Sequence, residues 1–130
     1  MASLSIPPSE TGGHGLLQER VVVVTAAAGT GIGSATARRA LLEGADVMIS
    51  DHHERRLSET RDTLSALGLG RVESVLCDVT SPVQIDALIA STTARFGRLD
   101  VLVNNAGLGG QTPVIEMTDE EWDRVLSVTL

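Results

Sequence analysis

The sequence predicts an α/β domain in which parallel strands alternate with helices, and three observations support this fold class. Four short apolar runs recur along the chain, and a segment with helical spacing of apolar residues follows each of the first three. Glycine-containing turns separate several of these segments. A capped helix start also follows the fourth run. Strict alternation of strands and helices favours a parallel sheet with right-handed crossovers.

The expected elements begin at a run of four valines, residues 21–24, which suits a strand buried on both faces. An alanine-rich helix is expected at 34–43, and Gly44 is its stop signal. The remaining elements are strands 45–50, 72–77 and 99–103, helices 54–67 and 81–96, and a helix opened by 118–121.

Two of these helices start with strong local signals. Ser81 is a suitable N-cap, Pro82 suits the first turn, and Gln84 completes a capping box. Thr118 and Glu121 form a second capping box at the start of the last helix. Both pairs predict where a helix begins.

Length and composition define one domain and exclude several classes of protein. We expect residues 1–17, rich in Ser, Pro and Gly, to form a flexible arm, and 18–130 to form a partial Rossmann domain. A net charge of −7 argues against binding to nucleic acid or to anionic membranes. A single cysteine, Cys77, fits a reducing cytoplasm, and we expect its thiol to be buried and inert. The three histidines show no metal-ligand spacing, and adjacent His52 and His53 should point in different directions.

Gly29, Gly31 and Gly33 form a glycine-rich turn between the valine strand and the next helix. Glycines let a pyrophosphate approach the backbone, and the helix that follows presents its free N–H groups to the phosphates. The context of strand, turn and helix therefore predicts a dinucleotide site. The alternative is a simple turn between a strand and a helix.

Asp51 closes the second apolar run, where a carboxylate could accept hydrogen bonds from the adenosine ribose. Such a carboxylate would repel a 2′-phosphate, so we expect NAD rather than NADP. The nearby His52, Arg55 and Arg56 keep NADP possible. The alternative role of Asp51 is to cap the next helix, with Glu54 three residues further on.

Two further strand ends carry polar residues. Asp78 could accept from the adenine amino group and the Val79 backbone could pair with the ring, or Asp78 could simply cap a helix or form a turn. Asn104 and Asn105 could satisfy backbone groups where strands splay. The segment Ala106-Gly107 leaves room for the nicotinamide ribose.

Over about residues 19–130 these motifs resemble the short-chain dehydrogenase/reductase family. The resemblance implies a Rossmann fold with strand order 3-2-1-4, binding of NAD(P), and hydride transfer between the cofactor and an alcohol or ketone. The residues at 24–33 and 105–113 are similar to those of actinobacterial members that act on fatty-acyl or steroid-derived ring substrates, some as CoA thioesters. Family members are also commonly homo-oligomers. The cofactor-binding residues it implies are Thr25, Gly29, Thr30, Gly31, Ile32, Gly33, Asp51, Asp78, Val79, Asn104, Asn105, Ala106 and Gly107.

Three departures from the family pattern limit what the resemblance implies. The glycine turn is one residue longer than usual, with Ala26 or Ala27 where the first glycine is expected. Thr129 stands where the family usually carries an Asn that supports a proton relay. The catalytic Ser and the Tyr-x-x-x-Lys pair are expected beyond Leu130, so no catalytic residue is assigned and the 130 residues alone should be inactive.

Two other functions are compatible with these motifs. One is a non-catalytic NAD-binding module or an inactive fragment. The other is a Rossmann methyltransferase, which also pairs a glycine-rich turn with an acidic residue after the second strand. Methyltransferases usually place an acidic residue just before the glycines, where this chain has Thr25 to Ala28.

Overall fold

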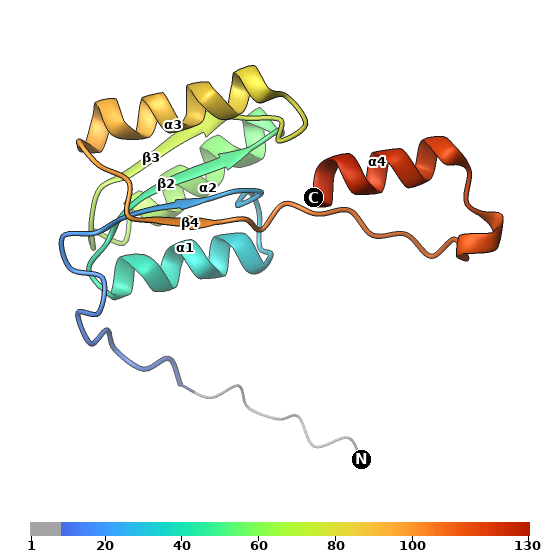
Figure 1. Ribbon diagram of the computed structural model, residues 1–130. Helices are drawn as coiled ribbons and strands as arrows, with labels where there is room; N and C mark the ends of the chain where they lie inside the picture. Colours follow the sequence, from blue (N-terminus) through green and yellow to red (C-terminus); the bar gives the residue numbers. More distant parts are fainter. Residues whose placement is uncertain (1–8) are drawn as a thin grey trace, which may run out of the picture.

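In the computed structural model, which describes residues 9–130, four parallel strands form one sheet in the order β3-β2-β1-β4 (Figure 1). This order and the α/β fold class agree with the prediction from sequence. The strands are β1 (Val21–Val24), β2 (Asp46–Asp51), β3 (Val72–Leu76) and β4 (Val101–Val103). Residues 1–8, which are part of the arm expected at 1–17, lie outside the described residues.

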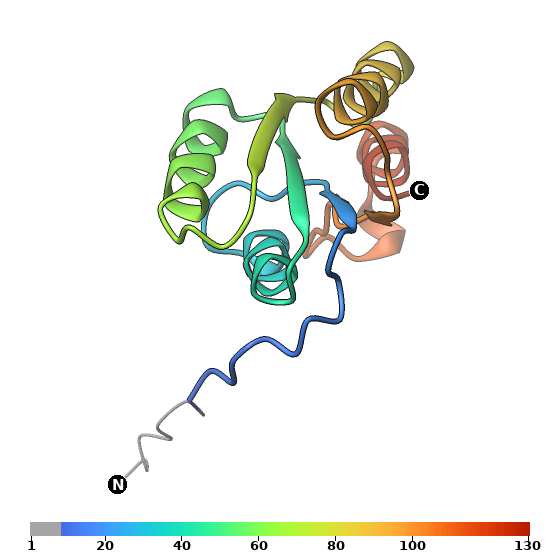
Figure 2. The ribbon, with the colours of Figure 1, turned by 90° about the vertical axis from the view of Figure 1, so that its left-hand side faces the viewer.

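Helices cover both faces of the sheet (Figure 2). Val22 and Val24 of β1 pack with the buried residues of two helices, whereas Val21 and Val23 pack with Leu88 and Phe96 of a third. Successive side chains of a strand point to opposite faces, so the four valines bury both sides of β1. The helices are α1 (Ile32–Leu42) and α2 (Glu54–Ser65) on one face, α3 (Pro82–Phe96) on the other, and α4 (Asp119–Thr129).

α4 lies beyond the end of β4 rather than on the sheet (Figure 1). It contains no buried residue, and Trp122 is 48% exposed. A short 3-10 helix, Val114–Glu116, precedes it and was not predicted from the sequence. None of the helices within residues 9–130 combines the length and the apolar character needed to cross a bilayer.

Several element ends differ from the sequence prediction. α1 begins at Ile32 rather than Ser34, because Gly31 adopts the extended N-cap conformation. α2 ends at Ser65 rather than Leu67, because the chain tightens as the Leu67 N–H donates to the Leu64 carbonyl. β4 spans 101–103 instead of 99–103, and the strand and helix limits elsewhere agree with the prediction to within one residue.

The two predicted capping boxes have different outcomes. At the start of α4, Thr118 accepts from the Glu121 N–H at 3.2 Å and Glu121 accepts from the Thr118 N–H at 3.0 Å, so this box is complete. At α3, Ser81 accepts from the Gln84 N–H, but the Gln84 side chain accepts from the Asp78 N–H instead. The reciprocal half of that box is therefore a wrong prediction.

Glu43, directly after α1, holds the segment before β1 against the domain. Its carboxylate is buried, accepts from the N–H groups of His14 at 2.8 Å and Leu16 at 3.2 Å, and pairs with Arg39. Chiefly through the two backbone hydrogen bonds, the pKa of Glu43 falls from 4.5 to about 2. The domain boundary at residue 17 stays a prediction, and the contacts of Glu43 with His14 and Leu16 lie on the arm side of it.

We predict that Glu43→Gln lowers the melting temperature most at neutral pH. The folded pKa lies below the unfolded one, so ionised Glu43 stabilises the fold above about pH 4.5, and this stabilisation is lost as the pH falls toward 2. Melting curves of both proteins across this range check the prediction, with Glu59→Gln on exposed α2 surface as control. A gap in melting temperature that does not change with pH would contradict it.

Candidate functional site

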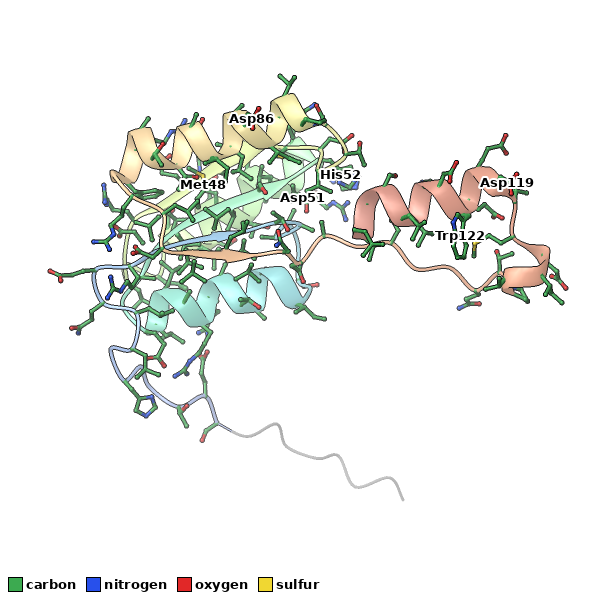
Figure 3. All side chains as sticks on the ribbon, viewed as in Figure 1. Met48, Asp51, His52, Asp86, Asp119 and Trp122 are labelled. Carbon is green, nitrogen blue, oxygen red and sulfur yellow. The ribbon has the colours of Figure 1, made fainter. Side chains whose placement is uncertain are left out.

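The carboxyl ends of the four parallel strands meet at one edge of the sheet, where α/β folds bind their ligands. A cavity of about 440 Å³ opens there. Asp51 and His52 lie at this end of the sheet, on the side that faces α4 (Figure 3). Of the predicted site residues, the cavity is lined by Asp51, Asp78, Val79, Ala106 and Gly107. The sequence did not predict its other lining residues, which are Ala26, His52, Cys77, Thr80, Leu108, Arg124, Ser127 and Val128.

The glycine turn is built from glycines with different roles. Gly29 has φ +86°, a conformation that only glycine adopts without strain. A Cβ on Gly33 would come within 2.6 Å of the Ala26 carbonyl oxygen and 2.7 Å of Asn105 Nδ2, so only glycine fits between these groups. A Cβ on Gly31 would meet no atom within 4 Å, so the space beside it is open. The turn is therefore tight on one side and open on the other.

The N-terminus of α1 is available to an anion. Its N-cap, Gly31, offers no side-chain acceptor, and the first turn contains no acidic residue. Each of the other three described α-helices has a side-chain cap, an acidic residue in its first turn, or both. The first N–H groups of a helix have no partner within the helix, and the helix dipole favours negative charge there. This arrangement suits a phosphate group.

Asp51 connects the end of β2 to the glycine turn. Its carboxylate accepts from the Ala28 N–H at 3.2 Å and from the His53 N–H at 3.0 Å, and the residue is 7% exposed. The predicted alternative, Asp51 as N-cap of α2, is wrong because His53 occupies that position. Each carboxylate oxygen can accept more than one hydrogen bond, so Asp51 retains acceptor capacity toward the cavity.

Asp78 forms a turn after β3, as one of its predicted alternatives stated. One carboxylate oxygen accepts from the Thr80 N–H at 2.9 Å and from the Thr80 hydroxyl at 2.7 Å. Chiefly through the backbone bond, these contacts hold the pKa of Asp78 below its usual value. Ser81, not Asp78, is the N-cap of α3. The Asp78 carboxylate is thus ionised and oriented at the rim of the cavity.

Thr25 and Asn105 connect β1 to the segment after β4. The Thr25 hydroxyl accepts from the N–H groups of Asn105 at 3.0 Å and Ala106 at 3.1 Å. In return, Asn105 Nδ2 donates to the carbonyls of Thr25 and Ala26, both at 3.1 Å. Asn105 therefore satisfies backbone groups where the strands splay, whereas its neighbour Asn104 is exposed.

The remaining predicted residues do not line the main cavity. Gly29 and Thr30 lie instead on a second cavity of about 400 Å³ between α1 and α2. Neither cavity is lined by Thr25, Gly31, Ile32, Gly33, Asn104 or Asn105. Gly31, Ile32 and Gly33 belong to the turn and the start of α1, and Thr25 and Asn105 hydrogen-bond to each other.

Thr129, which stands where the family usually carries an Asn, hydrogen-bonds to the backbone of Leu108. Its hydroxyl accepts from the Leu108 N–H at 3.1 Å and donates to the Leu108 carbonyl at 3.4 Å. This pair of bonds joins the end of α4 to the loop after β4. Arg124 and Ser127 of the same helix line the cavity, and no local pattern in the sequence indicates that they reach it.

Two expectations about reactive side chains have opposite outcomes. Cys77 is 2% exposed, and burial raises the pKa of its thiol, as expected for an inert cysteine. The rings of His52 and His53 lie 3.9 Å apart, so the expectation that they point in different directions is wrong. They follow the end of β2, where strand alternation no longer applies. Ligand atoms of Asp51 and both histidines lie within 4.8 Å of one another, and the expectation of no metal stays a prediction.

Comparison with known proteins identifies the family. The family described as short chain dehydrogenase matches residues 20–130. The chain belongs to this family. It is 79% identical, over 128 residues, to the (5R,7aS)-5-hydroxy-7a-methyl-1-oxo-2,3,5,6,7,7a-hexahydro-1H-indene-carboxyl-CoA reductase of Mycobacterium tuberculosis, covering 98% of this chain and 49% of that protein. It is 40% identical to the short-chain reductase protein NovJ of Streptomyces niveus, of which it covers 48%.

A solved structure agrees with the family assignment. The crystal structure of a short chain dehydrogenase from Mycobacterium smegmatis superposes with a TM-score of 0.94 at 75% sequence identity. The match covers 98% of this chain and 53% of that chain. This chain thus spans about half the length of the relatives it matches.

Proposed function

We propose that this chain is the cofactor-binding half of an oxidoreductase that uses NAD, with NADP as the alternative. The observation that carries the proposal is the placement of Asp51 and Asp78 around one cavity, at the edge of the sheet where α1 begins with no side-chain cap. The nicotinamide of such a cofactor accepts or donates a hydride. Family membership also removes the methyltransferase alternative.

The residues of this chain would divide the work of holding the dinucleotide. The turn at Gly31 and the first N–H groups of α1 would hold the phosphates, because both are open to an anion. Asp51 would accept from the adenosine ribose hydroxyls, and Asp78 with the Val79 backbone would hold the adenine edge. The segment Ala106-Gly107 would leave room for the nicotinamide ribose. Each of these roles continues the sequence prediction and is a proposal.

For the substrate, we propose a CoA thioester that carries a ring ketone or alcohol. The support is the relative from M. tuberculosis, whose name describes an indene-carboxyl-CoA reductase and which is 79% identical over the matched half. We also propose that the complete protein is a homo-oligomer and that the Ser and Tyr-x-x-x-Lys pair of the family lie in the second half of its length. Turnover of such thioesters by the complete protein, with free CoA as control, tests the substrate proposal. Light scattering of the complete protein tests the homo-oligomer, and loss of turnover on substituting that Ser or Tyr tests the placement of the catalytic residues.

Titration calorimetry with NAD and NADP tests the cofactor proposal directly. We expect NAD to bind more tightly, because the Asp51 carboxylate would repel a 2′-phosphate. Equal affinity for both dinucleotides would overturn the preference for NAD. If neither dinucleotide binds, the proposed function is overturned.

The variant Gly31→Ala should weaken NAD binding and leave the melting temperature unchanged. Its Cβ meets no atom of the protein but would occupy the space proposed for the phosphates. Loss of a hydrogen bond to a charged group costs roughly 1.5–3 kcal/mol, about a ten- to hundredfold loss of affinity. Gly12→Ala, on an exposed segment with equally open space, is the control. Retained affinity in Gly31→Ala would show that the phosphates lie elsewhere.

A further inference from the structure

The glycine turn makes contacts with α2 that the family pattern does not predict. Backbone N–H groups away from water need acceptors, and a turn with an extra residue has more of them to satisfy. The Ala28 N–H donates to Asp51, and the Gly29 N–H donates to Thr60 Oγ1 at 2.8 Å. Thr60 is 31 residues from Gly29 in sequence and lies in the second turn of α2.

Thr60 is fixed in the orientation that accepts this bond. It is 7% exposed, and its hydroxyl donates its one proton to the Arg56 carbonyl at 2.8 Å. The lone pairs of the oxygen are then directed to the Gly29 N–H. A valine at this position would have the same shape but could not accept, so the partly buried Gly29 N–H would lose its partner.

We infer that Thr60 is a positioning residue for the glycine turn: its hydroxyl holds Gly29 against α2 and so keeps the opposite side of the turn, at Gly31, open. Gly29 has φ +86°, but a glycine can adopt many other backbone conformations as readily. The turn therefore needs an external hydrogen bond that selects this conformation. No atom lies within 4 Å of a Cβ at Gly31, in contrast to the crowded Gly33. The consequence for phosphate binding rests on the proposed function.

The substitution Thr60→Val tests the inference, with Thr60→Ser as the conservative variant. Thr63→Val is a matched control, because the Thr63 hydroxyl donates to the Glu59 carbonyl at 2.8 Å in the same helix and receives no bond from the turn. The full chain is used throughout. The readouts are hydrogen exchange of the Gly29 amide and the dissociation constants of NAD, ADP and adenosine.

We expect Thr60→Val to speed Gly29 amide exchange and to weaken NAD and ADP by about tenfold, which corresponds to the loss of one ordinary hydrogen bond. Adenosine lacks phosphates, so its affinity should change little. Thr60→Ser should restore both readouts, and Thr63→Val should alter neither.

Several results would overturn the inference. These are unchanged Gly29 exchange in Thr60→Val, equal losses in Thr63→Val, or an equal loss of affinity for adenosine and ADP. If the parent chain binds no dinucleotide, the proposed function fails and the consequence for phosphates falls with it. Gly29 exchange then decides alone whether Thr60 holds the turn.

Discussion

Replacing Gly33 by alanine should lower the stability of the fold and abolish NAD binding together. The added Cβ would come within 2.6 Å of the Ala26 oxygen and 2.9 Å of the Ala27 Cα, which are backbone atoms that cannot rotate away. Overpacking of this kind typically costs about 1–3 kcal/mol, and relief would require the turn to move away from α1. Urea unfolding measures the first effect, and calorimetry with NAD measures the second.

Gly31→Ala is the informative comparison for this variant because it lies two residues away in the same turn. Its Cβ meets no protein atom, so its unfolding midpoint should match that of the parent. The pair separates a glycine required for packing from a glycine required for ligand access. If Gly33→Ala unfolds at the parent's urea concentration, the close packing of this turn in the structure is wrong.

Asn105→Asp should destabilise the protein strongly at neutral pH. The change replaces two donated hydrogen bonds by a carboxylate oxygen that faces the carbonyl oxygens of Thr25 and Ala26. Leaving a buried polar group unsatisfied costs about 1–3 kcal/mol, and more when the group is charged. The same variant should weaken NAD binding, because these two carbonyls belong to the start of the glycine turn.

The pH dependence of Asn105→Asp identifies its cause. Two facing carbonyl oxygens and partial burial would raise the pKa of the new carboxyl in the folded state above its unfolded value. The destabilisation should therefore be complete above the folded pKa and diminish as the pH falls through it, since a protonated carboxyl can donate once. Asn104→Asp, at the exposed neighbouring position, should change stability little at any pH. A deficit in Asn105→Asp that is independent of pH would argue against this mechanism.

Features encoded within a few residues could be predicted from the sequence alone. The valines of β1, the capping box of Thr118 and Glu121, and the stops at Gly44 and Gly97 depend on side-chain periodicity and local hydrogen bonds. The order of the strands also agrees with prediction, because parallel crossovers and the resemblance leave one arrangement for four strands. The sequence further indicated that Asp51 and Asp78 end their strands, and strand ends meet at one edge.

Contacts between distant segments were decided by the tertiary structure. The bonds from Gly29 to Thr60 and from Leu108 to Thr129 join residues 31 and 21 positions apart, and the bonds of Glu43 reach back to His14. A threonine that accepts from a distant turn has the same local pattern as Thr63, which does not. Whether a hydroxyl or a carboxylate accepts from a backbone N–H depends on where packing of the helices on the sheet places that side chain.

For this chain, the sequence by itself determined the elements and the edge of the sheet that carries the site, whereas packing decided which side chains support the turn.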